Sequence, residues 1–223
     1  MTSIAVVGAN GRTGRIVVEQ ALACGHRVTA IVRRPGSFSP APGLREVIAD
    51  PTIPGSLHGL LVGHDAVIST LGAADRAPTI VYSASTAEII AAMPPGGRLL
   101  VVSSAGLDVP ADAGPASRVL AAALHRIMCH TYTDMARMEQ FLTESALRWT
   151  AVRPTRLTDK PGATIPRVSL GATSKVGPQI SRADLAAYLL DAVDDPHTHH
   201  VAVSVSSGRV LRNATAVCRS ASR

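Results

Sequence analysis

The chain has 223 residues, of which 46% are hydrophobic and 17% charged, so it is long enough and apolar enough to fold around one core. This composition excludes intrinsic disorder for most of the chain, and no apolar run is long enough to span a membrane. The formal charge of +6 invites a nucleic-acid interpretation, but the arginines are scattered, only Arg33 and Arg34 being adjacent, and aromatic residues make up only 3%. We therefore expect no nucleic-acid partner and no membrane.

The start of the chain and its cysteines indicate a compartment. Met1 leads directly into the apolar run over residues 4–7, without the basic region and cleavage site of a signal peptide. Cys24, Cys129 and Cys218 are far apart, and their spacing is typical of neither a zinc site nor a disulfide framework. A cytoplasmic protein is the expectation.

Apolar, β-branched segments alternate along the chain with longer amphipathic or alanine-rich segments. Strands are predicted over residues 3–7, 27–32, 45–49, 65–70, 98–102, 148–152 and 200–205. Helices are predicted over residues 12–24, 55–62, 79–93, 116–145, where a break is allowed, and 182–193. Strands such as 99–102 are apolar without alternation, so helices should cover both faces of the sheet.

This alternation predicts an α/β fold with a doubly wound parallel sheet in a single domain. The domain should span residues 1–210 and include small C-terminal elements on the substrate side. Residues 211–223 are small and polar, and a mobile tail is expected there.

A glycine-rich turn separates the first predicted strand from the first predicted helix. In a phosphate-binding turn of the Rossmann type, Gly8 permits the tight turn, Gly11 lets the backbone approach a pyrophosphate, and Gly14 lets the helix pack against the strand. The amides of the first helical turn then face the anion. The motif predicts a dinucleotide site that also includes Asn10, Arg12 and Thr13. An ordinary glycine-rich connection is the alternative.

Two arginines follow the second predicted strand, where an NAD-specific site usually has an acidic residue for the ribose hydroxyls. Arg33 and Arg34 instead favour the 2′-phosphate of NADPH, through charge and a planar set of donors, although two surface arginines would give the same pattern. Asp50, after the third predicted strand, is a candidate acceptor for the adenine amino group or a turn former before Pro51.

With these motifs in place, the sequence resembles the atypical short-chain dehydrogenases, in particular the group of biliverdin-IXβ/flavin reductases and NmrA-like NAD(P)-binding proteins. The resemblance spans about residues 3–206, and its motifs are the glycine turn, Ile31-Val32-Arg33, the segments 65–72, 101–105, 137–139 and 144–154, and the later segment 180–186. It implies that Leu71 and Gly72 line the cofactor cleft, that Ser103 and Ser104 lie beside the nicotinamide, and that Pro154 and Thr155 border its ring. Capping of the turn after the strand is the alternative for the two serines.

Many short-chain dehydrogenases use a Tyr-x-x-x-Lys pair, in which the lysine lowers the pKa of the tyrosine. The lysines of this chain are Lys160 and Lys175, and Tyr132 is followed four positions later by Ala136. The resemblance then implies hydride delivery to a conjugated acceptor with little acid–base assistance. The candidate polar groups near the acceptor are Ser104, Tyr132, His130 and Arg156.

The leading hypothesis is an NADPH-dependent reductase of a small conjugated or aromatic molecule, such as a flavin, quinone or enone. A non-catalytic NADP-binding redox sensor or regulator of the NmrA type is the second hypothesis. A tailoring enzyme that isomerises, dehydrates or cyclises its substrate is the third, since a fold does not fix a reaction. We expect a small-molecule partner, no metal, and a monomer or small homo-oligomer.

Overall fold

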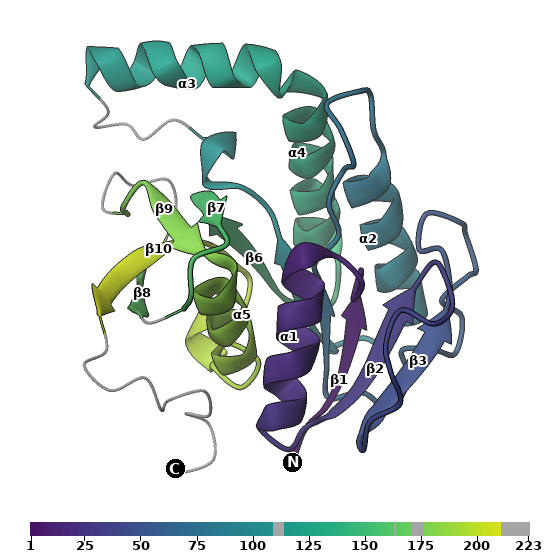
Figure 1. Cartoon of the computed structure of the whole chain (residues 1–223). Helices are drawn as coiled ribbons and strands as arrows, with labels where there is room; N and C mark the ends of the chain where they lie inside the picture. Colours follow the sequence, from purple (N-terminus) through teal and green to yellow (C-terminus); the bar gives the residue numbers. More distant parts are fainter. Residues whose placement is uncertain (109–113, 163, 171–175, 211–223) are drawn as a thin grey trace.

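An eight-stranded sheet lies at the centre of the molecule (Figure 1). The computed structural model describes residues 1–108, 114–162, 164–170 and 176–210. The strands are β1 (Ser3–Val7), β2 (Arg27–Val32), β3 (Leu44–Ile48), β4 (Ala66–Ser69), β5 (Arg98–Val102), β6 (Arg148–Pro154), β8 (Thr164–Leu170) and β10 (Val201–Val210). Each of the seven predicted strands is present, shifted at its ends by a few residues at most apart from β10, which continues to Val210.

The order of the strands creates a reversal in the middle of the sheet. The order is β3-β2-β1-β4-β5-β6-β10-β8, so the chain builds outward from β1 to β3 and then returns to place β4 on the other side of β1. Neighbours are parallel from β3 to β10. A doubly wound sheet binds its ligands outside the carboxyl ends of the strands at such a reversal, so a site is expected beyond β1 and β4.

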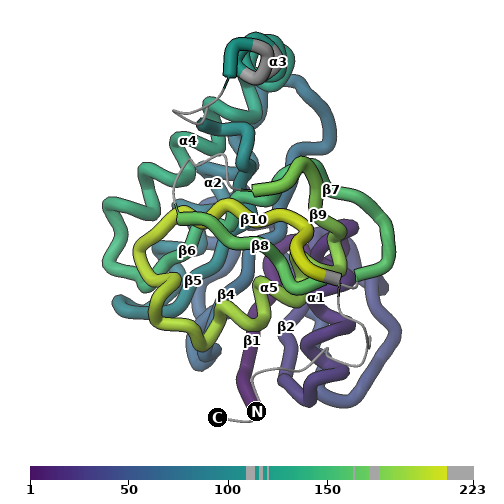
Figure 2. The backbone as a smooth tube through the Cα atoms, turned by 90° about the vertical axis from the view of Figure 1, so that its left-hand side faces the viewer, coloured from purple at the N-terminus to yellow at the C-terminus, as the bar shows by residue number. Residues whose placement is uncertain are grey.

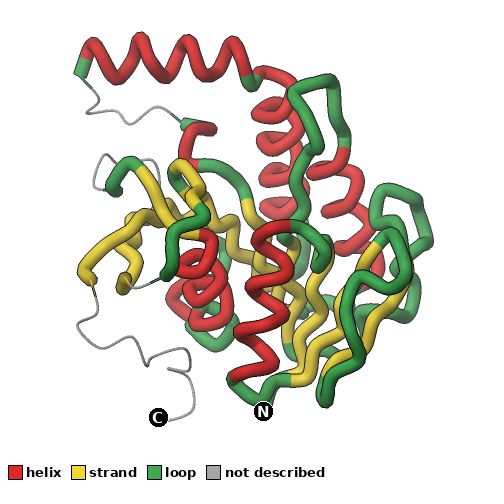
Figure 3. Tube along the Cα trace, viewed as in Figure 1, coloured by secondary structure: helices red, strands yellow, loops and turns green. Residues whose placement is uncertain are grey.

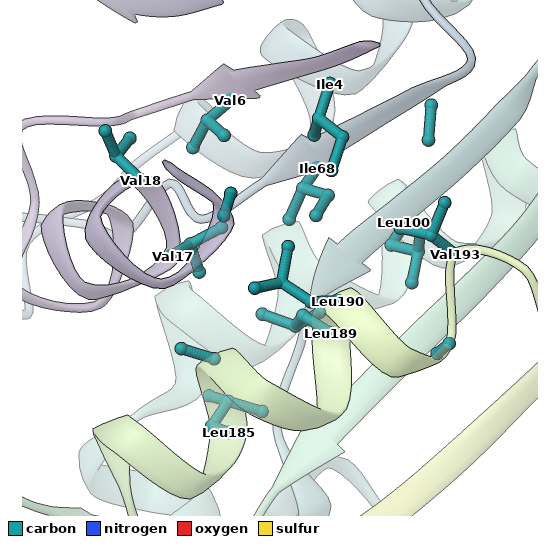
Figure 4. Packing of buried hydrophobic residues seen from close by; sticks show 14 of the residues in the cluster. Ile4, Val6, Val17, Val18, Ile68, Leu100, Leu185, Leu189, Leu190 and Val193 are labelled. Carbon is teal, nitrogen blue, oxygen red and sulfur yellow. The ribbon is translucent and has the colours of Figure 1, made fainter. Parts of the chain in front are cut away.

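Helices cover both faces of the sheet, as the unbroken apolar strands predict. Helices α1 (Arg12–Ala23) and α5 (Arg182–Asp191) lie on one face, and α2 (Val81–Ala92) and α4 (Cys129–Glu144) on the other (Figure 1). Successive residues of a strand point to opposite faces, so Val6 packs with α1 and α5 while Val7 packs on the α2 and α4 side. Figure 4 shows Val17 of α1 and Leu189 of α5 among the side chains that pack between these two helices and the sheet. Each buried aliphatic side chain of this kind contributes roughly 1.5–3 kcal/mol.

The amino end of α2 is capped by a residue of another helix. Its own N-cap residue, Ile80, makes no side-chain cap. The carboxylate of Asp134 on α4, which is 2% exposed, accepts from the backbone N–H groups of Tyr82 at 2.9 Å and Ser83 at 3.3 Å, and also from the Ser83 hydroxyl. Asp134 therefore satisfies free donors at a positive helix end and joins α4 to α2.

The predicted helix over residues 55–62 is wrong. This segment is a series of turns, because Gly55 and Gly59 have φ angles of 80° and 71°, which an α-helix cannot contain. Leu57 and Leu61 are still buried, so the apolar pattern was present without the helix. The carboxylate of Glu88 holds the turns in place by accepting from the N–H groups of Gly55 and Leu57, both at 2.8 Å.

The predicted helical region 116–145 is divided at Met128 into α3 (Pro115–Ile127) and α4. Helix α3 runs across the top of the molecule and is seen end-on in Figure 2, above the sheet. Its exposed apolar side chains include Val119 and Ile127, at 72% and 52% exposure.

Three strands were not predicted. Strands β7 (Arg156–Thr158) and β9 (Gln179–Ser181) form a separate parallel pair near the carboxyl end of the main sheet (Figure 3). They have three residues each, which leaves no periodicity to detect. Strand β8 contains Pro166, which argues against a strand except at the edge of a sheet, and β8 is an edge strand antiparallel to β10. The sheet is therefore mostly, not wholly, parallel.

Two further expectations concern the cysteines and the end of the chain. Cys129 has an exposed free thiol. The expected tail 211–223, with Cys218, lies outside the described residues.

Candidate functional site

The glycine turn lies directly beyond the carboxyl end of β1. Gly8 has a φ of 77°, which favours glycine, and an added Cβ there would lie 3.1 Å from the backbone nitrogen of Leu71. At Gly14 an added Cβ would overlap the carbonyl oxygen of Gly8 and lie 2.7 Å from the hydroxyl oxygen of Thr70. The N–H of Gly11 donates to the carbonyl of Gly8 at 2.9 Å. The turn is therefore packed so closely at Gly14 that a side chain is excluded there.

A cavity of about 310 Å³, which we call the first cavity, lies beside this turn at the reversal of strand order. It extends from the turn to the ends of β2 and β4. Its lining residues are Gly8, Asn10, Gly11, Ile31, Val32, Arg33, Arg34, Ala49, Pro51, Thr70, Leu71 and Gly72. The structure thus brings predicted cofactor residues of the turn and of β4 together with both predicted arginines.

Arg33 and Arg34 are exposed at the end of β2 and line the first cavity. Asp50, in contrast, is not among the lining residues. Its carboxylate accepts from the backbone N–H of Thr52 at 3.0 Å and from the Thr52 hydroxyl at 2.7 Å. These hydrogen bonds lower the pKa of Asp50, with a further contribution from the charge of Arg33. This is the geometry of the turn-forming alternative, in which Asp50 orders the chain at Pro51.

Asn10 and Arg12 of the turn have partners within the protein. Asn10 accepts from the guanidinium of Arg15. Arg12 pairs with Asp159 at 2.6 Å, and Asp159 also pairs with Arg182 at 2.6 Å. The hydrogen bond from Arg12 and the charges of both arginines lower the pKa of Asp159. Thr13 is 8% exposed in the first turn of α1.

The predicted nicotinamide neighbours are placed at strand ends but are engaged within the protein. The Ser103 hydroxyl, after β5, donates to Glu139 at 2.6 Å. Ser104 accepts from the N–H of Gly106 at 3.2 Å and so caps the short helix η1 (Ala105–Leu107), as the alternative predicted. Pro154 is buried at the end of β6, and the N–H of Thr155 donates to Val205 at 3.1 Å.

A second cavity, of about 480 Å³, lies farther along the same edge of the sheet. Helix α4, η1 and β6 form its walls together with α3. Its lining residues are Leu107, Asp108, His125, Cys129, Tyr132, Thr133, Ala136, Glu139 and Arg153. The ring of Tyr132, which is 7% exposed, meets the ring of His125 edge-on with centroids 5.0 Å apart.

A network of charged groups forms one wall of the second cavity. Arg153 donates from Nε and Nη2 to the two oxygens of Glu139, at 3.0 and 2.5 Å, and from Nη1 to Asp108. Burial opposes the charged form of Arg153, but its hydrogen bonds to and the charges of Glu139 and Asp108 outweigh burial and raise the pKa. Glu139 therefore connects α4 to both β6 and the Ser103 hydroxyl.

Sequence reasoning gave no role to this network. Glu139 and Arg153 occur in two segments that carry the family resemblance, yet each is a charged residue where the apolar period predicts burial. A charged residue at a position where burial is predicted indicates a buried ion pair, because charged groups are seldom buried without a partner. The partner itself comes from another element.

Of the four candidate polar groups near the acceptor, only Tyr132 lines one of the two cavities. Ser104 is the cap of η1. Arg156 is exposed on β7 and donates to Gln179 at 3.1 Å. His130 is exposed on α4.

Membrane spans and metal sites are both absent from the described residues. No helix there is both long and apolar enough to cross a membrane. Nor do the described ranges contain a group of three His, Cys, Asp or Glu side chains arranged to hold a metal ion.

Comparison with known proteins agrees with this geometry. An oxidoreductase from Lactococcus lactis has 18% sequence identity and a TM-score of 0.76, over 94% of this chain and 92% of that one. A protein from Streptococcus pneumoniae assigned as an NADH–flavin reductase has 24% identity and a TM-score of 0.72, over 93% of this chain and 100% of that one. A short-chain dehydrogenase/reductase from Veillonella parvula, solved in complex with NADP, has 18% identity and a TM-score of 0.72, over 94% and 96%. A family model described as NAD(P)H-binding matches residues 8–196, from the glycine turn to beyond α5, and the chain therefore belongs to the NAD(P)H-binding family.

Proposed function

We propose that this protein is an NADPH-dependent reductase that transfers hydride to a small conjugated or aromatic acceptor, of the flavin, quinone or enone type. The observation that carries the proposal is the first cavity, which has the glycine turn at one end and two exposed arginines at the other. The residues fit a dinucleotide phosphate, because the turn excludes side chains at Gly14 and leaves backbone at its surface.

In this proposal Gly8 and Gly11 let the backbone approach the pyrophosphate, and the first amides of α1 face its charge. Arg33 and Arg34 bind the 2′-phosphate by charge-assisted hydrogen bonds. The bound cofactor supplies a hydride and the acceptor receives it. Leu71 and Gly72 continue the wall from the first cavity towards β5, where Ser103 and then Pro154 and Thr155 would border the ring.

The acceptor end of the site is proposed to orient its ligand more than to move protons. Tyr132 has Ala136, not lysine, four residues later, Lys160 is exposed, and Lys175 lies outside the described residues. Ser104 and Arg156 remain candidates for polar contact with an acceptor, Arg156 as a permanent cation that would stabilise developing negative charge. The similarity to the Streptococcus pneumoniae and Veillonella parvula proteins supports reductase chemistry with such a cofactor.

Cofactor preference tests the proposal. At low salt we expect NADPH to bind at least about tenfold more tightly than NADH, because a charge-assisted hydrogen bond contributes roughly 1.5–3 kcal/mol. Arg33→Asp should move the preference towards NADH, since it repels the phosphate and offers an acceptor to the ribose. Arg27→Asp is the matched control, because Arg27 is exposed at the opposite end of the same strand. Equal affinity of the unmodified protein for both cofactors, by titration calorimetry, would remove the role given to the arginines.

A redox sensor is the second candidate, and the engagement of Ser103 and Ser104 within the protein favours it. A sensor needs cofactor binding without a reacting acceptor. NADPH oxidation measured with a panel of flavins, quinones and enones separates the two functions. Tight NADP binding without turnover on any member of the panel would favour the sensor over the reductase.

A further inference from the structure

We propose that the second cavity is the acceptor site and that it selects flat acceptors without negative charge. This inference rests on the reductase function proposed above and goes beyond it by naming the charge class of the acceptor. It depends on the position of the second cavity, the shape of its walls and the charges that line it.

The second cavity is placed where an acceptor could meet the cofactor. Leu71 and Gly72, beyond β4, line the first cavity, and β4 pairs with β5. The segment after β5 carries Leu107 and Asp108, which line the second cavity, and Arg153 reaches it from β6. A dinucleotide that extends along this edge from Arg33 therefore brings its reactive end towards the second cavity.

The walls of the second cavity suit a flat conjugated ring. Tyr132 and His125 supply aromatic surface, and Leu107 and Ala136 supply aliphatic surface. The Nε2 atom of His125 is buried and has no hydrogen-bond partner among the described residues. The volume of about 480 Å³ lies within the range of small-molecule sites.

The charges of the lining oppose an anion. Asp108 and Glu139 are carboxylates, and Arg153 is the one arginine or lysine among the described residues that line this cavity, so the lining carries a net charge of −1. All three kinds of donor nitrogen of Arg153 are engaged, two with Glu139 and one with Asp108. An anionic acceptor could recruit Arg153 only by displacing one of these carboxylates, Asp108 from Nη1 or Glu139 from a bidentate pair that is nearly buried, with 10% and 13% of the two side chains exposed.

The two cavities therefore have opposite charge. In the first, Arg33 and Arg34 are exposed, and neither takes part in the salt bridges of the described residues. In the second, the arginine is neutralised by two carboxylates. A phosphorylated cofactor and an uncharged acceptor would each be directed to its own cavity by this difference.

A matched pair of quinones tests the inference. The probes are a naphthoquinone with a fully alkylated quinone ring, which cannot add to thiols, and the same molecule with a ring sulfonate. Affinities are measured by equilibrium dialysis with saturating NADP⁺. Occupancy is measured as protection of Cys129 from alkylation, by peptide mass spectrometry, because Cys129 has an exposed free thiol and lines the second cavity. The neutral quinone should bind at least tenfold more tightly and protect Cys129.

Asp108→Asn tests the cause of the selection. Asp108 is half-exposed, with 48% of its side chain accessible, so its loss should leave the fold intact while one donor of Arg153 is freed. The affinity for the sulfonate should rise at least fivefold relative to the neutral quinone, which corresponds to roughly 1 kcal/mol. Glu144→Gln is the control for charge, because Glu144 is exposed on α4 and lines neither cavity.

The outcomes separate this inference from the reductase function. Selective binding and protection by the neutral quinone, without NADPH oxidation, would support the acceptor charge class and contradict the reductase. NADPH oxidation by both quinones with equal affinity would support the reductase and overturn the inference. Failure of both quinones to protect Cys129, or tighter binding of the sulfonate, would also overturn it.

Discussion

Gly11 and Gly14 are three residues apart in the same turn, but different atoms face them. A Cβ at Gly14 would overlap the backbone carbonyl of Gly8 and approach the carbonyl of Ala9 to 2.8 Å. A Cβ at Gly11 would meet the Gly8 carbonyl at 3.1 Å, and the next atom, the carbonyl oxygen of Thr70, lies 3.9 Å away. Gly14 is therefore restricted by the packing of the fold itself. Gly11 faces the first cavity, which it lines.

Substitution of the two glycines should therefore give different results. Gly14→Ala is expected to lower the free energy of unfolding by roughly 1–3 kcal/mol, the usual cost of overpacking. Gly11→Val should stay folded and lose most of its NADPH affinity, because its side chain projects where the pyrophosphate would lie. Urea unfolding and cofactor titration measure the two effects. An unchanged NADPH affinity in a folded Gly11→Val protein would contradict the phosphate-binding role of the turn.

Tyr132 forms part of the wall of the second cavity, and we do not expect it to act as a proton shuttle. Tyr132→Phe keeps the ring that meets His125 and should retain most of the turnover with a conjugated acceptor. Loss of a general acid costs about a hundredfold or more. A drop of that size in kcat, with KM and NADPH affinity unchanged, would show that the hydroxyl transfers a proton.

At the scale of elements, α2 depends on a residue that lies 52 positions later in the chain than the first amide it caps, Tyr82. Asp134 provides the acceptor that the sequence around Ile80 does not. A capping search along the sequence examines only the residues next to a helix and so misses such a contact. The turns after Asp50 depend in the same way on Glu88 of α2.

Asp134→Ala should lower the free energy of unfolding by about 2 kcal/mol or more, because two backbone donors and the Ser83 hydroxyl lose a buried acceptor. Glu144→Ala removes an exposed carboxylate from the same helix and should change stability by less than about 0.5 kcal/mol. Thermal and urea unfolding of the two variants give the comparison. Equal stability of the variants would mean that α2 does not need this cap.

At the scale of the whole molecule, the features that could be predicted from the sequence are those that depend on neighbouring residues along the chain. The strand β1, the glycine turn and α1 are consecutive, and each supports the interpretation of the next. The pairing of Glu139 with Arg153 could not be predicted in this way, because the two residues belong to different elements, α4 and β6, that local periodicity does not relate. The error at residues 55–62 has a different origin, since Leu57 and Leu61 repeat at helical spacing while glycines with positive φ determine the backbone.

The position of Arg33 and Arg34 affects how fast a cofactor arrives as well as how tightly it binds. Both side chains are exposed at the mouth of the first cavity, on a protein with a formal charge of +6. At physiological ionic strength their field extends about 8 Å into the solvent, so an anionic dinucleotide is attracted before it touches the protein. Added salt should consequently slow association more than it hastens dissociation, and the first cavity captures its ligand by long-range attraction as well as by shape.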